Sequence, residues 1–217
     1  MNIIGVEGAT ALAGALEQGS FPALREIWLD GNSIGDEGAR ALAGAFERGS
    51  FPALEWIVLG WSHIGDEGAK ALAGALERGS FAGLQIIGLG YNNIGDEGAA
   101  ALAGALERGS FPKLRRIELG CNNIGDEGAK ALAAALERGS FPKLESIDLH
   151  GNNIGDKMQK QVRSAISVMH VRIRLRAFLG AERDLAPVTA AKGFLWRDGD
   201  RAAMHRVARF VMAAYDG

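Results

Sequence analysis

Cys121 and His150 are the residues whose types and spacing could support nucleophilic chemistry, with Glu118 and Asp148 nearby in the sequence. A thiol becomes an effective nucleophile when a base lies within hydrogen-bond reach, a third group orients that base, and donors stabilise an oxyanion. The repeat pattern described below places these residues on an open strand face, which offers no pocket that excludes water. We therefore expect no catalysis and predict that the chain is not an enzyme. One cysteine and one histidine also fall short of the four ligands of a structural zinc site, so we expect neither a metal nor a cofactor.

The elements that would position these residues come from a repeat of 30 residues without insertions. Four near copies occupy Phe21–Ser50, Phe51–Ser80, Phe81–Ser110 and Phe111–Ser140. A partial copy precedes them, and a fifth begins at Phe141 and loses its likeness after Asp156. A repeat of this length indicates a solenoid, because one unit cannot bury its apolar face without stacking on its neighbours.

Within each copy the apolar period changes from that of a strand to that of a helix. Ile27 and Leu29 alternate with exposed residues, and a helical stripe follows at Ala39, Leu42, Ala43 and Phe46. We expect Asp36 to cap this helix at its N-terminus and Gly49 to end it in the left-handed conformation. The repeated Gly-Asp-Glu-Gly lacks the oxygen ligands of an EF-hand and the lysine of a P-loop, so helix capping and close packing account for it.

The motif Leu24-x-x-Ile27-x-Leu29-x-x-Asn32-x-Ile34 resembles the leucine-rich repeat. The following Gly-Asp-Glu-Gly-Ala-x-Ala-Leu-Ala-x-Ala-Leu pattern is similar to the ribonuclease-inhibitor-like subtype, which also forms repeat domains of NACHT-type nucleotide-binding receptors and of Ran GTPase-activating proteins. The resemblance covers about residues 2–156. It implies an α/β fold, a curved leucine-rich-repeat solenoid of about five 30-residue strand-helix units, with a parallel sheet on the concave face and helices on the convex face. Repeats of this family serve many unrelated partners, so the GTPase-activating function is not carried over.

In that family an asparagine ties the backbones of neighbouring turns into a ladder. The matching positions here are Asn2, Asn32, Asn92, Asn122 and Asn152, whereas Ser62 stands in one copy. A hydroxyl cannot donate and accept over the reach of a carboxamide. We therefore predict a weaker or water-filled rung at Ser62.

The copies differ mainly at outward positions on the strand and just after it. In-register parallel strands would turn these positions into rows on one surface, with aromatic side chains over the first three strands and charged ones on the last two. The predicted partner-binding residues are Trp28, Trp56, Trp61, His63, Tyr91, Arg116, Glu118, Asp148 and His150. Exposed aromatic clusters rimmed by charge are typical of protein-binding hot spots. The alternative is drift among recently duplicated units, whose aromatic residues merely cover one another.

The two ends of the repeat region call for different expectations. The first unit has a helix but no strand, so the strand at 25–29 would present an unpaired edge. That edge fits a fragment of a longer protein, self-association with another chain, or a short exposed edge. At the other end we divide the chain into a solenoid, residues 1–156, and a C-terminal helical capping segment, residues 157–217. A helical stripe continues in the cap at Val162, Ala165, Ile166 and Met169.

Two stretches of the cap are less regular in pattern. Residues 171–176 alternate like a strand yet join helical segments, which leaves their state ambiguous. A final amphipathic helix is predicted to begin at Asp198 or Asp200.

Charge divides the chain in the same way. Residues 1–154 carry 12 basic and 20 acidic side chains, and residues 155–217 carry 12 and 6, which together give the net charge of −2. The basic residues Arg172, Arg174, Arg176, Arg183 and Arg206 could contact phosphates. Acidic residues interrupt them and no nucleic-acid-binding motif is present, so we do not expect a nucleic-acid or acidic-surface partner.

The 217 residues contain no secretory signal pattern and no apolar stretch long enough to span a membrane. A single cysteine favours a reducing compartment, and we expect an intracellular, cytoplasmic protein. Taken together, the sequence predicts a non-enzymatic scaffold that binds a protein or peptide through its concave strand face. The alternatives are a structural or self-associating repeat protein and a fragment of a larger receptor-like protein.

Overall fold

The computed structural model describes residues 4–79, 81–139 and 141–183, with 172–183 described by their backbone alone. Helices and strands alternate along the chain in the order α1 Gly5–Gln18, β1 Glu26–Trp28, α2 Gly35–Arg48, β2 Trp56–Val58, α3 Asp66–Arg78, β3 Ile86–Gly88, α4 Asp96–Arg108, β4 Arg116–Glu118, α5 Asp126–Arg138, β5 Ser146–Asp148 and α6 Asp156–Arg183. The chain forms two compact units, Met1–Met169 and His170–Gly217. The domain division after residue 156 stays a prediction.

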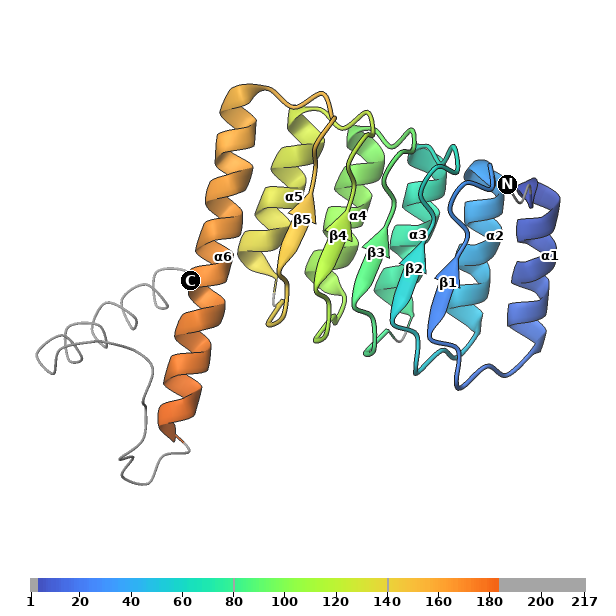
Figure 1. Ribbon diagram of the computed structural model, residues 1–217, viewed down its shortest axis with the longest axis horizontal. Helices are drawn as coiled ribbons and strands as arrows, with labels where there is room; N and C mark the ends of the chain where they lie inside the picture. Colours follow the sequence, from blue (N-terminus) through green and yellow to red (C-terminus); the bar gives the residue numbers. More distant parts are fainter. Residues whose placement is uncertain (1–3, 80, 140, 184–217) are drawn as a thin grey trace, which may run out of the picture. The chain divides into compact units, whose positions relative to one another are not determined.

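All five strands form one parallel sheet in the order β1-β2-β3-β4-β5. The pairing is in register, so the central isoleucines form one row: Ile27, Ile57, Ile87, Ile117 and Ile147. The strands make one layer of the first unit, and α1 to α5 make the other (Figure 1). This arrangement confirms the predicted α/β solenoid and its register.

The core lies between the two layers and repeats with the units. The inward residues of β2 and its flanks are buried, and the phenylalanine at the next corner is buried with them: Leu54, Ile57, Leu59, Ile64 and Phe81. Small residues on the helices let neighbouring units approach closely. At the last repeat, Val162 and Ala165 of α6 pack against Ala129 and Ala133 of α5, which extends the core into α6.

Gly49 ends α2, but its backbone conformation differs from the predicted one. Its φ of −82° is extended, so the expected left-handed conformation is wrong. A Cβ atom at Gly49 would lie 2.5 Å from the Phe51 ring and 2.8 Å from the carbonyl oxygen of Ala45. Glycine therefore stands at this position because the next corner packs against its backbone.

Asp36 caps the helix of the next unit, and its predicted role on its own helix is wrong. No side chain caps α2. The Asp36 carboxylate instead accepts hydrogen bonds from the amides of Gly65 at 2.7 Å and Gly68 at 2.8 Å, where α3 begins. Asp66 and Asp96 make the same two contacts with α4 and α5. The Gly-Asp-Glu-Gly motif thus joins units, because the carboxylate meets the positive end of a neighbouring helix and the glycines leave room for it.

The asparagine ladder is present over the described residues. The carboxamide oxygen of Asn92 accepts from the amides of Ser62 and Ile64, each at 3.0 Å. Its nitrogen donates to the carbonyl of Leu59 at 2.9 Å. Asn122 and Asn152 hold equivalent rungs. Asn32 accepts from the amide of Ile4, and Asn2 lies outside the described residues.

The Ser62 hydroxyl makes fewer hydrogen bonds than the carboxamide of Asn92, and the weaker rung stays a prediction. The Ser62 side chain is fully buried, and its hydroxyl lies 3.0 Å from the carbonyl oxygen of Gly60 and 3.3 Å from that of Leu29. One proton serves both carbonyls. Within the described residues the hydroxyl accepts no amide, whereas Asn92 accepts two.

Residues 171–176 belong to α6, so this ambiguous stretch is helical. Val162, Ala165 and Met169 are buried along the predicted stripe. The predicted final helix and Arg206 lie outside the described residues, as do the side chains of Arg172, Arg174, Arg176 and Arg183.

Ser62→Asn should stabilise the protein by about 1–2 kcal/mol, because a carboxamide could accept amide hydrogen bonds as Asn92 does, in addition to donating to a carbonyl. The measurement is the free energy of unfolding from urea denaturation. Asn92→Ser is the matched control and should destabilise by about 1–3 kcal/mol. Equal stability of Ser62→Asn and wild type would show that the serine rung is not deficient.

Asp36→Ala should lower the free energy of unfolding by about 1–2 kcal/mol, because it removes the cap of the following helix. Glu37→Ala is the control, since Glu37 lies on the same turn outside the capping contacts and should change stability by less than about 0.5 kcal/mol. In hydrogen exchange, capping between units predicts that the amides at the start of α3 exchange faster in Asp36→Ala than in wild type. Faster exchange of α2 amides alone would contradict it.

Candidate functional site

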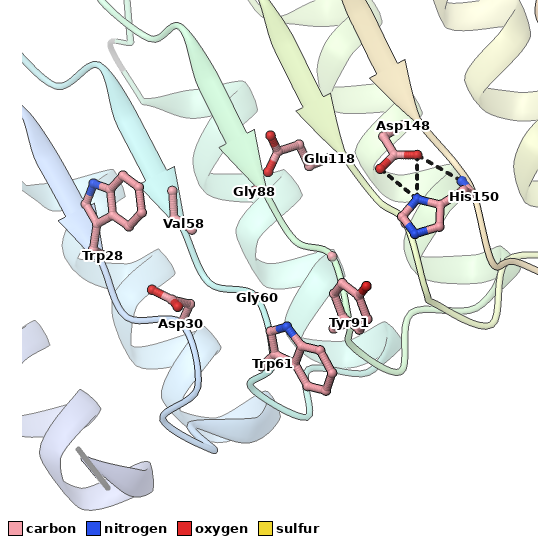
Figure 2. A pocket seen from close by; sticks show the side chains of 12 residues that line it. Trp28, Asp30, Val58, Gly60, Trp61, Gly88, Tyr91, Glu118, Asp148 and His150 are labelled. Atoms are coloured by element: carbon pink, nitrogen blue, oxygen red, sulfur yellow. Dashed lines mark hydrogen bonds and ion pairs between the residues drawn. The ribbon is translucent and has the colours of Figure 1, made fainter. Parts of the chain in front are cut away.

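An open groove of about 240 Å³ crosses the strand face of the first unit (Figure 2). It runs over the ends of all five strands and the turns that follow them. Its walls come from aromatic and acidic side chains, and its floor comes from a row of glycines. The lining residues are Trp28, Asp30, Val58, Gly60, Trp61, Gly88, Gly90, Tyr91, Glu118, Gly120, Asp148 and His150.

Trp61 and Tyr91 form the most ordered part of the aromatic wall. Their rings are stacked, with centroids 4.0 Å apart and planes 10° from parallel. Both residues follow a strand at a position where the backbone has positive φ, 54° for Trp61 and 56° for Tyr91. Bulky residues rarely adopt this conformation, so the repeated turn holds both side chains on the surface at some cost in strain. Trp61 is 60% exposed and Tyr91 is 43% exposed.

Trp28 and Trp56 form a second aromatic pair on neighbouring strands. Their ring centroids lie 5.5 Å apart, and the planes are tilted by 44°. Trp28 is 54% exposed, and its indole N–H donates to Glu26 at 3.0 Å. Trp56 is half-buried and does not line the groove. Trp28 therefore offers its ring to the groove while Trp56 supports it from the side.

Carboxylates gather along the groove. Asp30 lies near Trp28, and Glu118 and Asp148 lie at the other end (Figure 2). Partial burial raises the pKa of Asp148, but hydrogen bonds from the His150 amide and ring lower it by more, so the pKa of this carboxyl lies below its usual value. No lysine or arginine is among the residues that line the groove.

His150 links Asp148 to Cys121. The ring nitrogen Nδ1 lies 2.8 Å from both carboxylate oxygens of Asp148. The other ring nitrogen, Nε2, lies 3.3 Å from the Cys121 sulfur. A hydrogen bond with Cys121 raises the pKa of the Tyr91 hydroxyl above its ordinary value, with smaller contributions from charge on Cys121, burial, and charge on Asp148.

The groove brings together most of the predicted binding residues, namely Trp28, Trp61, Tyr91, Glu118, Asp148 and His150. Trp56 and Arg116 are the first residues of β2 and β4, whereas the groove is lined by the last residue of each strand. His63 lies in the turn after β2, two residues beyond Trp61. These three do not line the groove.

The sequence analysis did not include Asp30 and Val58 among the binding residues, although both line the groove. Asp30 occupies the same repeat position as His150, and Val58 occupies that of Trp28 and Asp148. The contribution of the glycines was also missed. A Cβ atom at Gly88 would lie 3.3 Å from a Val58 methyl group and 3.5 Å from the Glu118 carboxylate. The missing side chain at Gly88 thus creates the floor. The sequence contains the pattern that could have predicted this floor, because Gly88 stands where every other copy has a larger residue.

Among the described residues, no group of three or more histidine, cysteine, aspartate or glutamate side chains is arranged to hold a metal ion. In the same part of the chain, none of the helices combines the length and apolar character needed to cross a membrane.

Comparison with solved structures shows the same fold in proteins of low identity. The structure of "Leiomodin-1 Actin-Binding Site 2 (ABS2)" matches 85% of this chain and 99% of its own, with a TM-score of 0.62 and 16% identity. The tropomodulin C-terminal domain of Caenorhabditis elegans matches 78% of this chain and 98% of its own, with a TM-score of 0.59 and 16% identity. A search of curated proteins returned no match.

A family profile described as "Leucine Rich repeat" matches the chain five times, at residues 23–43, 55–73, 84–103, 112–133 and 142–157. Each match begins shortly before a strand and ends within the following helix. The matches therefore follow the strand-helix units of the solenoid. This part of the chain therefore consists of leucine-rich repeats.

Proposed function

We propose that this protein is a non-enzymatic scaffold whose strand-face groove binds a protein or peptide segment. The observation that carries the proposal is the Trp61–Tyr91 stack, which holds two large rings against solvent at one end of a groove. Exposed aromatic side chains of this size are uncommon on a monomer unless they bind something. Stacking also fixes the rings before a partner arrives, which reduces the entropy lost on binding.

The charge of the groove indicates the chemistry of the bound segment. Asp30, Glu118 and Asp148 supply carboxylates, and the aromatic faces of Trp28, Trp61 and Tyr91 attract cations. An arginine or lysine side chain would contact an aromatic face and a carboxylate together. The partner we propose is therefore a basic segment of a protein.

The size of the groove favours an extended segment over a globular surface. A standard interface buries about 800 Å² on each partner. Five strands about 4.8 Å apart, each exposing about 10–13 Å, present only on the order of 250–300 Å² in projection. A peptide-like segment fits this area without contacts elsewhere on the protein.

The subtype, location and partner extend this proposal. A full helix of 13 residues in α3, α4 and α5 supports the ribonuclease-inhibitor-like subtype. The single cysteine supports a reducing, intracellular compartment. The similar leiomodin-1 domain is named as an actin-binding site, which supports a protein partner in general. At 16% identity the likeness is one of fold, and we do not extend it to actin.

Self-association is a second candidate function, because β1 pairs with β2 and has no second strand neighbour in the described sheet. An open strand edge can pair with another chain. Under this hypothesis the mass measured by light scattering should double as the concentration rises through a dilution series. A constant monomer mass over that series would exclude it.

Trp61→Ala should weaken binding of an arginine-containing peptide by about tenfold to a hundredfold, because it removes one face of the aromatic stack. The measurement is a fluorescence anisotropy titration with a labelled peptide that carries several arginines. Glu118→Gln should also weaken binding and should reduce its dependence on salt, because it removes a charge that attracts the peptide.

His63→Ala is the matched control, since His63 is exposed on the same turn but lies outside the groove. It should leave affinity unchanged. A second control is the same peptide with glutamates in place of its arginines, which should bind at least about tenfold more weakly. Equal binding of the two peptides, or full binding by Trp61→Ala with a normal melting curve, would refute the proposed groove function.

A further inference from the structure

Cys121, His150 and Asp148 form a continuous chain of contacts at the acidic end of the groove. The imidazole Nδ1 lies 2.8 Å from both Asp148 oxygens, which assigns the Nδ1 proton to that contact. Nε2 is then the unprotonated nitrogen, and it lies 3.3 Å from the Cys121 sulfur. A thiol, a base and a carboxylate that orients the base are therefore in line.

We propose that Cys121 is a nucleophilic thiol that undergoes thiol–disulfide exchange, with His150 as its base. His150 Nε2 takes the proton from the Cys121 sulfur, and the thiolate attacks one sulfur of a bound disulfide. A bond forms between that sulfur and Cys121 while the original S–S bond breaks. Its electron pair stays on the leaving sulfur, which receives the proton from His150. The disulfide is thereby converted to a free thiol and a mixed disulfide with Cys121.

Exchange with a disulfide suits this site better than acyl transfer. Attack on a carbonyl creates an oxyanion that needs preorganised donors, and the open strand face offers no enclosed donor pair. Attack on sulfur creates no oxyanion. Its rate depends mainly on the thiolate fraction, on the leaving group and on access. The expectation that the chain is not an enzyme is compatible with this reaction, because the product is a covalent modification of Cys121.

Glycines at two adjacent turn positions leave space for the three side chains: Gly120 stands where the next copy has His150, and Gly151 stands where the preceding copy has Cys121. A Cβ atom at Gly120 would lie 2.5 Å from His150 Nδ1 and 2.9 Å from an Asp148 oxygen. A Cβ atom at Gly151 would lie 2.9 Å from the Cys121 sulfur. Glycine at both positions therefore permits the close approach of thiol, ring and carboxylate.

The other groups that face the thiol and the imidazole come from neighbouring turns and strands. Tyr91 contacts His150 edge-on, with ring centroids 6.4 Å apart, and interaction with Cys121 raises the pKa of the Tyr91 hydroxyl. Glu118 lines the same end of the groove and Asp148 carries a negative charge. These carboxylates would repel an anionic disulfide, so a neutral disulfide is the appropriate probe.

The test measures the rate at which the full chain reacts with dipyridyl disulfide, a neutral reagent that releases an absorbing product. The repeat offers a matched control thiol, Tyr91→Cys in a Cys121→Ser background. It occupies the same turn position one unit earlier, where Gly120 stands in place of His150. We expect Cys121 to react about tenfold faster than this control near pH 7, where an ordinary thiol is only a few per cent ionised.

His150→Gln should reduce the rate to that of the control thiol. Asp148→Asn tests a positioning role, because it keeps an oxygen to accept from Nδ1 but removes the negative charge beside the imidazolium that forms when His150 takes the thiol proton. It should give an intermediate rate and a steeper fall in rate as the pH decreases than wild type shows. A merely structural role for Asp148 would leave that pH profile unchanged.

Detection of the mixed disulfide on Cys121 adds a second readout besides the reaction rate. Wild type exposed to bis(2-hydroxyethyl) disulfide, which is neutral, should gain one hydroxyethylthio group on Cys121 by mass spectrometry, and His150→Gln should gain much less in the same time. The proposal is overturned if Cys121 reacts no faster than the control thiol, or if His150→Gln reacts as fast as wild type. Neither outcome depends on peptide binding in the groove.

Discussion

The structure depends on one constraint, that each unit must satisfy the backbone of its neighbour. Asn92 accepts amides of the preceding unit, and Asp36 accepts the first amides of the following helix. Buried backbone groups without partners are costly, so these two residue types fix the spacing and register of the whole stack. Once they are in place, the isoleucine rows and the sheet follow. The same requirement explains why the copies are nearly identical wherever units touch.

That constraint leaves few positions free to vary, and the groove is built from them. Residues just after each strand have their backbone fixed by the turn, including positive φ at Trp61, Tyr91 and Cys121. Their side chains lie on the strand face, outside the buried core that packs neighbouring units together. Large rings, a thiol or no side chain at all can therefore occupy the same turn. Function can change at these positions without loss of the fold.

The sequence was sufficient to predict the features that repeat in every unit. It was insufficient to predict which groups an individual side chain contacts. The period, the register, the buried isoleucines and the smaller number of hydrogen bonds at Ser62 follow from spacing and from the number of donors and acceptors. Spacing alone does not say whether a carboxylate turns toward its own helix or the next, and so the role of Asp36 was missed. Trp56 and Trp28 lie on neighbouring strands, yet only Trp28 lines the groove. The contact of Cys121 with His150 likewise required coordinates, because both residues face an open surface in the sequence pattern.

Tyr91 connects the two activities that we propose for the groove. Its ring stacks on Trp61 and also contacts the ring of His150, the base beside Cys121. A segment that binds over the stack would lie beside the thiol, so a disulfide carried by such a segment would be delivered to Cys121 at high effective concentration. Conversely, a mixed disulfide on Cys121 would add bulk beside the stack and would compete with a bound segment. Thiol–disulfide exchange at Cys121 and occupancy of the groove are therefore coupled by geometry.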